Sequence, residues 1–237
     1  MTYSSPFNYC PFESIDNEIK KCPEDKTGTV IIPSGTVSIG QSSFALCKGV
    51  SEVIIPNTVQ IIKDYAFAGC TDMKSISIPE SVIEICRYAF RMCDDKLFNI
   101  YEGVRYLGDE ENPYRFLIEP ISNDITECVV HPQCRMITDI AFEYCAGLEA
   151  ISLSENLTRI GREAFDGCRK LRSIEIPSSV IEIGKYAFSN CTELSRVLIK
   201  NPMVSLGHKL FYQCTALNSM TVMERFGDKN VEREIPI

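Results

Sequence analysis

Residues 171–191 have the sequence LRSIEIPSSVIEIGKYAFSNC, and versions of this stretch recur along the chain. In each version a phenylalanine stands three residues before a cysteine. Successive cysteines are 23 residues apart, with the exception of one interval of 52 residues. A fixed period of this length is typical of a solenoid, in which each repeat forms one coil and stacks on its neighbours. The pairs are Phe44/Cys47, Phe67/Cys70, Phe90/Cys93, Phe142/Cys145, Phe165/Cys168, Phe188/Cys191 and Phe211/Cys214.

The residues around each pair predict one short strand per repeat. Apolar residues stand six and eight positions after the cysteine, as Ile174 and Ile176 do, and this alternation is typical of a strand with one buried face. A proline such as Pro177 then ends the strand. Residues 30–32 show the same pattern ahead of the first pair and predict an additional strand. A bend with an Ile–Gly pair leads from each strand to a compact helical or irregular arm that ends at the cysteine.

These positions together resemble the BspA-like class of leucine-rich repeat, over about residues 29–223. The resemblance implies an α/β solenoid, a right-handed superhelix with one parallel sheet on its concave side and short helical or irregular arms on its convex side. Proteins with this repeat occur on the surfaces of bacteria and of some parasitic protists. The resemblance therefore implies a non-enzymatic protein of the cell surface or the extracellular space, which binds host, matrix or cell-surface proteins in adhesion.

The period also divides the chain into parts. Residues 1–28 precede the repeats and predict an N-terminal cap, because an open solenoid end would expose apolar core. Residues 29–97 and 122–223 predict two repeat arrays of one continuous solenoid domain. Residues 98–121 interrupt the period between the arrays, and residues 224–237 predict a C-terminal cap or the start of a truncated region.

Residues 101–118 predict a β-hairpin within this interruption. Two runs rich in aromatic and β-branched residues flank the polar stretch GDEENP, residues 108–113. A similar insertion recurs in bacterial members of the resembled class. One interpretation is a spacer between the arrays. The other is a projecting binding element, because insertions in solenoids often lie on one accessible face. Its contact residues would be Tyr101, Tyr106, Tyr114 and Phe116.

The residues that alternate with the core positions of each strand are expected to point outward. In the resembled fold they form the concave face of the sheet, which predicts a binding surface for a protein, with a glycan as the second choice. This face is rich in hydroxyl groups and carries scattered charges, and the alternative interpretation is an ordinary solvated sheet face. The residues are Glu52, Ile54, Ser75, Ser77, Ala150, Ser152, Ser173, Glu175, Arg196, Leu198, Ser219 and Thr221.

The chain contains twelve cysteines. The seven of the repeat predict a column of buried thiols, since cysteine is among the most buried residue types. Cys128, His131 and Cys134 have a spacing that suggests zinc, but each of them falls in a structural position of the repeat and the ligand set is incomplete. We therefore predict no metal and no cofactor. Cys10 and Cys22 lie outside the repeat and are the candidate disulfide pair if the chain is exported into an oxidising compartment.

Composition and motifs narrow the function further. A net charge of −8 at pH 7 argues against nucleic acid as a partner, and no apolar run is long enough for membrane insertion. The first residues lack the pattern of a secretory signal, so the protein is either cytoplasmic or exported with a leader that was trimmed. Phosphate-binding, paired-carboxylate and dinucleotide motifs are not found, which predicts that the protein is not an enzyme. An intracellular interaction scaffold is the alternative to adhesion, and a carbohydrate-handling enzyme is the alternative from another class.

Overall fold

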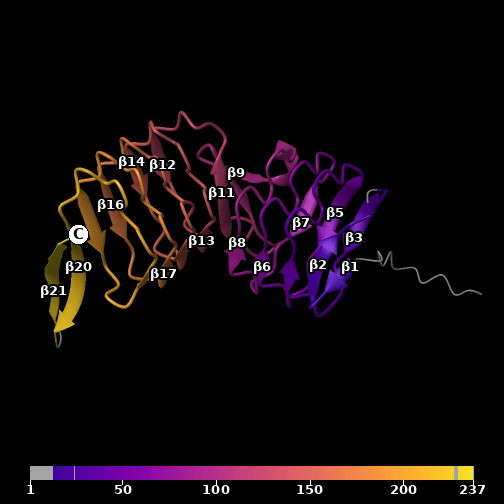
Figure 1. Cartoon of the computed structure of the whole chain (residues 1–237), viewed down its shortest axis with the longest axis horizontal. Helices are drawn as coiled ribbons and strands as arrows, with labels where there is room; N and C mark the ends of the chain where they lie inside the picture. Colours follow the sequence, from indigo (N-terminus) through magenta and orange to yellow (C-terminus); the bar gives the residue numbers. More distant parts are fainter. Residues whose placement is uncertain (1–12, 24, 227–228, 237) are drawn as a thin grey trace, which may run out of the picture. The chain divides into compact units, whose positions relative to one another are not determined.

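The computed structural model describes residues 13–23, 25–226 and 229–236 (Figure 1). In these ranges nearly all regular structure is β-strand, helix is confined to one short 3-10 turn, η1 (Asp95–Leu97), and no helix has the length and hydrophobicity to cross a membrane. The chain divides into two compact units. The N-terminal unit comprises Met1–Asn99 and Leu107–Pro113, and the C-terminal unit comprises Ile100–Tyr106 and Tyr114–Ile237. The right-handed superhelix and the single continuous domain stay predictions.

The predicted repeat strands form a parallel ladder in the N-terminal unit. Val30 lies beside Val53, and Val53 beside Ile76, so equivalent positions of successive repeats are neighbours. The first of these strands is the additional one that the sequence predicts ahead of the first Phe–Cys pair. The ladder consists of β3 (Gly28–Ile31), β5 (Val50–Ile54) and β7 (Ser75–Ser77).

The segments that were expected to form bends are short strands of a second parallel ladder. These strands are β4 (Ser38–Ile39), β6 (Ile61–Ile62) and β8 (Glu84–Ile85). At one end β4 pairs with a hairpin of β1 (Glu13–Ile15) and β2 (Glu18–Lys21). The turn residues Asp16 and Asn17 both have positive φ, as the tightest hairpin turns require. This hairpin is the described part of the predicted N-terminal cap.

The arms, which run from the short strands such as β4 to the repeat cysteines, are irregular loops. The sequence predicted helical or irregular arms, and the described residues show the irregular form. Two residues per arm, five and one positions before the cysteine, have positive φ, which interrupts an α-helix. Arm N–H groups donate instead to the next arm, as Phe165 does to the Ala187 carbonyl at 2.7 Å. The positive-φ residues are Ser42/Leu46, Tyr65/Gly69, Tyr88/Met92, Ile140/Tyr144, Glu163/Gly167, Tyr186/Asn190 and Lys209/Gln213.

The repeated phenylalanines form a stacked column inside each unit. The ring centroids of Phe44 and Phe67 are 4.9 Å apart, and those of Phe165 and Phe188 are 5.1 Å apart. All four side chains are fully buried. The separation of the rings is close to the spacing of neighbouring strands, about 4.8 Å, so the column follows from the stacking of the coils. It provides the continuous core that a single repeat could not form.

The repeat cysteines also satisfy the backbone of the column. The Cys168 thiol donates a hydrogen bond to the Phe142 carbonyl at 3.2 Å, and the Cys191 thiol donates to the Phe165 carbonyl at the same distance. Cys70, Cys93 and Cys214 make the equivalent bond. A buried carbonyl without a partner is costly, so this position favours a small side chain that packs as an apolar group and still donates.

The strands of the predicted hairpin belong largely to the C-terminal unit, whereas residues 107–113 belong to the N-terminal unit. These strands are β9 (Asn99–Tyr101), β10 (Val104–Leu107) and β11 (Phe116–Pro120). Arg105 forms a 2.7 Å ion pair with Glu119, and the Ile121 N–H donates to the Gly103 carbonyl at 2.8 Å, as an antiparallel β10–β11 hairpin requires. β11 then pairs in parallel with β13 (Met136–Ile137). The hairpin is therefore part of the sheet that contains the short strands of the C-terminal unit.

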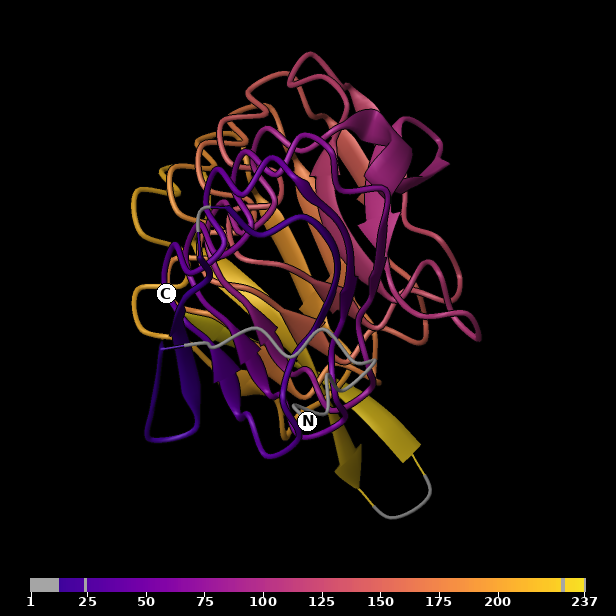
Figure 2. The same cartoon turned by 90° about the vertical axis from the view of Figure 1, so that its right-hand side faces the viewer.

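The C-terminal repeats form parallel ladders of their own. The sheet of β11 and β13 continues with β15 (Arg159–Ile160), β17 (Glu182–Ile183) and β19 (Ser205–Leu206), the short strands that follow the repeat strands. The repeat strands form two sheets, β12 (Glu127–Val129) with β14 (Ala150–Ser152), and β16 (Ser173–Ile176) with β18 (Arg196–Ile199), β20 (Ser219–Phe226) and β21 (Lys229–Pro236). The predicted C-terminal tail begins within β20, which forms a long antiparallel hairpin with β21, yellow in Figure 2.

Candidate functional site

The predicted outward residues of the N-terminal unit lie together on one surface. Glu52 is beside Ser75 and Ile54 is beside Ser77 across β5 and β7, and all four side chains are exposed or half-exposed. Val53, which alternates with them, is fully buried. We call this group, Glu52, Ile54, Ser75 and Ser77, the N-terminal strand face.

The predicted outward residues of the C-terminal unit form a second surface. Ser173 is beside Arg196 in the register of β16 and β18, while Ile174 between the outward residues is buried. The alternation predicted from the sequence thus places these side chains on the accessible side of the strands. We call this group the C-terminal strand face, and it consists of Ala150, Ser152, Ser173, Glu175, Arg196, Leu198, Ser219 and Thr221.

The N-terminal strand face is hollowed beside β7. The hollow has a volume of about 390 Å³ and combines strand-face residues with a loop that the sequence did not place there. The loop is held by the Gly108 carbonyl, which accepts the Ile78 N–H at 2.9 Å. The polar side chains of the lining are Glu52, Ser75, Ser77, Asn99, Asp109 and Glu110.

Local backbone geometry fixes this loop. The Asp109 Oδ1 atom accepts the N–H groups of Glu111 and Asn112 at 3.1 and 2.8 Å, which forms a tight turn. A Cβ atom on Gly108 would lie 1.9 Å from the Asn112 carbonyl oxygen, so the turn requires glycine. The sequence predicted this polar turn. It carried no signal for the contact with Ile78, because that contact lies outside the 23-residue period.

The C-terminal strand face has a second hollow, of about 330 Å³, lined by residues of β14 and β16. These neighbouring strands belong to different sheets. Lys200 contributes to the lining, and its Nζ atom lies 2.6 Å from the Glu175 carboxylate and 3.4 Å from the Glu155 carboxylate. The hydrogen bond to Glu175 raises the pKa of Lys200, which keeps the ammonium group charged. The carboxylates that line this hollow are therefore already paired with a lysine of the same chain.

The predicted contact residues of the hairpin need a correction. Tyr106 and Phe116 are buried, with exposed fractions of 0% and 1%, and cannot present their rings to a partner. Tyr106, on β10, packs in the buried apolar cluster of the C-terminal unit, and Phe116 lies on β11 between β10 and β13. Tyr101 and Tyr114 are half-buried and pack against the ring of His131. Tyr106 and Phe116 are therefore structural residues of the hairpin, while the loop between its strands lines the N-terminal hollow.

His131 is the centre of this aromatic cluster. Its ring stacks on Tyr114 with a centroid distance of 3.9 Å and meets the Tyr101 ring edge-on at 4.7 Å. The His131 N–H donates to the Tyr106 hydroxyl, and Nδ1 accepts the Gln133 N–H, both at 3.1 Å. Burial lowers the pKa of His131. The residue holds the hairpin to the first coil that follows it, in agreement with the structural role predicted from its position.

Two of the buried thiols illustrate why the column of repeat cysteines is poorly suited to nucleophilic chemistry. Burial raises the pKa of Cys70 and of Cys145 to about 12. Such thiols stay protonated at neutral pH, whereas the thiolate is the nucleophile and the metal ligand. Cys22 is buried, but Cys10 lies outside the described residues, so the predicted disulfide between them stays a prediction.

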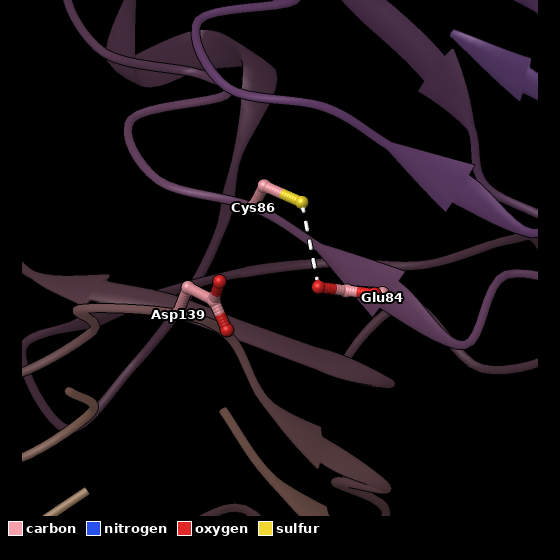
Figure 3. Close-up of side chains that lie close together, drawn as sticks. All are labelled: Glu84, Cys86 and Asp139. Carbon is pink, nitrogen blue, oxygen red and sulfur yellow. Dashed lines mark hydrogen bonds between the residues drawn. The ribbon is translucent and has the colours of Figure 1, made fainter. Parts of the chain in front are cut away.

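Cys86 replaces the glycine that four of the repeats have at its position. Figure 3 shows its thiol pointing toward Glu84, and its sulfur lies 3.7 Å from Glu84 Oε1. Asp139, labelled in the same figure, belongs to the C-terminal unit, where it accepts the Arg162 N–H at 2.7 Å. Each of the two carboxylates therefore has a structural partner within its own unit.

Several solved proteins are similar to this chain in structure. The pneumococcal vaccine antigen PcpA is 20% identical with a TM-score of 0.52, and the match covers 82% of this chain and 50% of that chain. A leucine-rich cell surface protein of Faecalibacterium prausnitzii is 25% identical with a TM-score of 0.47, over 85% and 61% of the two chains. A leucine-rich repeat protein of Eubacterium ventriosum is 20% identical with a TM-score of 0.47, over 86% and 71%. The chain thus spans half the length of the first of these proteins.

No curated protein matches the sequence. A family model does match, and it describes a BspA type leucine-rich repeat region. It matches in six copies, over residues 14–111 and 122–230. These two segments contain the two repeat arrays predicted from the Phe–Cys period, and they cover most of the chain. The chain belongs to the BspA-type leucine-rich repeat family.

Proposed function

We propose that this chain is a non-enzymatic binding protein that recognises other proteins through its two strand faces. The observation that carries the proposal is the exposure of hydroxyl, charged and small apolar side chains on strands whose opposite side is anchored in the core. Because each strand is held by its neighbours, the outward side chains form a surface with little freedom to lose on binding. Extended surfaces of this kind are the usual binding sites of solenoids.

The chemistry of the described residues supports binding more than catalysis. The Cys70 and Cys168 thiols donate to backbone carbonyls, and burial raises the pKa of both. The His131 ring is packed between tyrosines, and its Nδ1 atom already accepts a hydrogen bond. A general base or nucleophile needs an accessible lone pair, which these buried thiols and the Nδ1 atom of His131 do not offer.

We place the protein at the cell surface or outside the cell, where it would bind host or matrix proteins in adhesion. Family membership supports this location, since the BspA-like repeat occurs in surface proteins. Protein recovered from its native host tests the location through Cys10 and Cys22. A disulfide between them, found by peptide mapping with and without reduction, is the expected result. Two thiols at these positions would favour the intracellular scaffold instead.

An array of matrix, cell-surface and cytosolic proteins and glycans tests the binding function. The double variant Ser152→Lys and Ser173→Lys adds bulky charge to the C-terminal strand face. The matched control, Ser178→Lys and Ala216→Lys, adds the same charge at exposed positions outside both strand faces. We expect the native chain to bind surface or matrix proteins, the first variant to lose at least one of them, and the control to keep them all. Equal binding by both variants would contradict the proposal, as would an array without a protein partner.

A further inference from the structure

We propose that the hollow beside β7 binds an extended basic segment of a partner protein. The backbone of this segment pairs with the open edge of β7, and a lysine or arginine side chain lies between Glu52 and Glu110. The inference rests on the proposed protein-binding function and specifies the kind of partner that the N-terminal strand face takes.

The edge of β7 offers backbone groups for this pairing. β7 is the last strand in the order β3, β5, β7, so one of its sides has no strand neighbour in its sheet. Just beyond β7, the Ile78 N–H donates to Gly108 rather than to β5. Backbone groups of a strand alternate between its two sides, which directs the N–H and C=O of Ile76 to the same side as the Ile78 N–H. Ile76 lines the hollow, so an extended peptide can add there as a further strand.

The charge of the hollow selects a basic segment. Glu52, Asp109 and Glu110 line it, and its described lining contains no lysine or arginine. The Glu52 carboxylate is oriented by the Thr29 hydroxyl, which donates to it at 2.8 Å. Ile54, 42% exposed, provides apolar surface for the aliphatic stem of a lysine or arginine. The hollow thus presents carboxylate groups for the charged end of such a side chain and an apolar contact for its stem.

The C-terminal hollow is also lined by two carboxylates, and there a lysine of this chain already pairs with both of them. Glu155 and Glu175 line that hollow, and the Lys200 ammonium lies within 3.4 and 2.6 Å of their carboxylates. The lysine comes from the strand end of a following coil. The described lining of the N-terminal hollow contains no such basic group, and in our proposal a lysine or arginine of the partner takes its place.

Titration of the ¹⁵N-labelled full chain with the acetylated and amidated peptide VKVKV tests the proposal. The peptide VEVEV is the matched control. We expect VKVKV to shift the amide signals of Ile76 and Ser77 and to slow hydrogen exchange at Ile76, whereas VEVEV leaves both unchanged. Glu52→Gln combined with Glu110→Gln should weaken VKVKV binding about fivefold, the size expected for two partly exposed ion pairs.

The control variant Asp25→Asn with Asp72→Asn removes the same charge from the same unit at exposed positions outside the hollow, and should leave the affinity unchanged. Equal losses in the two variants would indicate binding to the overall negative charge and would overturn the proposal. Shifts confined to other residues, or no binding of VKVKV, would overturn it as well. The function proposed above survives these outcomes if the strand-face variants still lose their partner on the protein array.

Discussion

The position directly before each repeat cysteine combines a left-handed backbone with very different side chains. Gly69 and Gly167 occupy it in two repeats, and Leu46, Met92 and Tyr144 are among the residues that occupy it elsewhere. The glycines lie beneath the large side chains of the preceding coil. A glycine therefore follows a large residue at this position because the large side chain occupies the space where a β-carbon of the next coil would lie. The 23-residue period alone does not reveal this contact.

Gly167→Ala should lower the free energy of unfolding by about 1–2 kcal/mol. The substitution places a β-carbon on a residue with φ of +75°, at 2.7 Å from Tyr144 Cδ1. Urea unfolding followed by circular dichroism measures the effect. The matched control is Gly147→Ala in the same unit, where the nearest atom would lie 3.6 Å away and φ is not positive. Equal effects of the two substitutions would show that the left-handed backbone and the Tyr144 contact do not matter.

Alkylation should distinguish the buried thiols from ordinary ones. With a pKa of about 12, Cys145 and Cys70 carry roughly one thiolate in ten thousand molecules at pH 8, compared with about a quarter for an unperturbed thiol. Iodoacetamide followed by peptide mapping should modify them at least a hundred times more slowly in the native chain than in 8 M urea. Rapid modification of the native chain would mean that the coils open.

At the scale of elements, the inserted hairpin is held by one histidine whose protonation weakens the fold. Burial lowers the pKa of His131 from 6.5, so the unfolded chain binds a proton more readily than the folded chain. Stability from this group is complete above about pH 6.5 and is lost as the pH falls through that value toward the lower folded pKa. Protonation would also place an N–H at Nδ1 against the Gln133 N–H that it accepts.

The melting temperature should therefore decrease between pH 7.5 and pH 5.5. The His131→Gln variant should be less stable at pH 7.5 and should lose most of this pH dependence. The control His208→Gln changes the second of the two histidines, which is exposed, and should keep the pH dependence. Thermal melts at both pH values measure the effect. The assignment fails if His131→Gln and the native chain show the same decrease.

At the scale of the whole molecule, stability comes from contacts between neighbouring coils. Phe67→Ala and Phe165→Ala each remove a fully buried ring that stacks on two others. Each should cost about 3–5 kcal/mol through lost burial and the cavity that remains. Thermal melts measure the total loss. Hydrogen exchange should show the largest loss of protection in the coils next to the substituted ring, and an unchanged melting midpoint would refute the core position of that ring.

The amino-acid sequence by itself determined the features that recur every 23 residues. The Phe and Cys columns, the repeat strands and their outward residues follow from the period, because each position meets its own equivalent in the next coil. The family resemblance followed from the same positions and was confirmed by the family match. The positive φ values and the second ladder are also periodic, but residues such as Tyr65 and Ile140 gave no sign of a left-handed backbone.

Only the tertiary structure decided the features outside the period. The burial of Tyr106 and Phe116 depends on the segments that surround β10 and β11 in the folded chain. The sequence could not predict it, because a run of aromatic residues is compatible with a buried hairpin and with an exposed one. The N-terminal hollow depends on the bond from Ile78 to Gly108, between residues 30 positions apart that belong to no repeated pair. Contacts within the period join residues that occupy the same position in neighbouring repeats, so the spacing in the sequence predicts them. The contacts outside the period join residues at unrelated positions, and only the folded structure shows which of them meet.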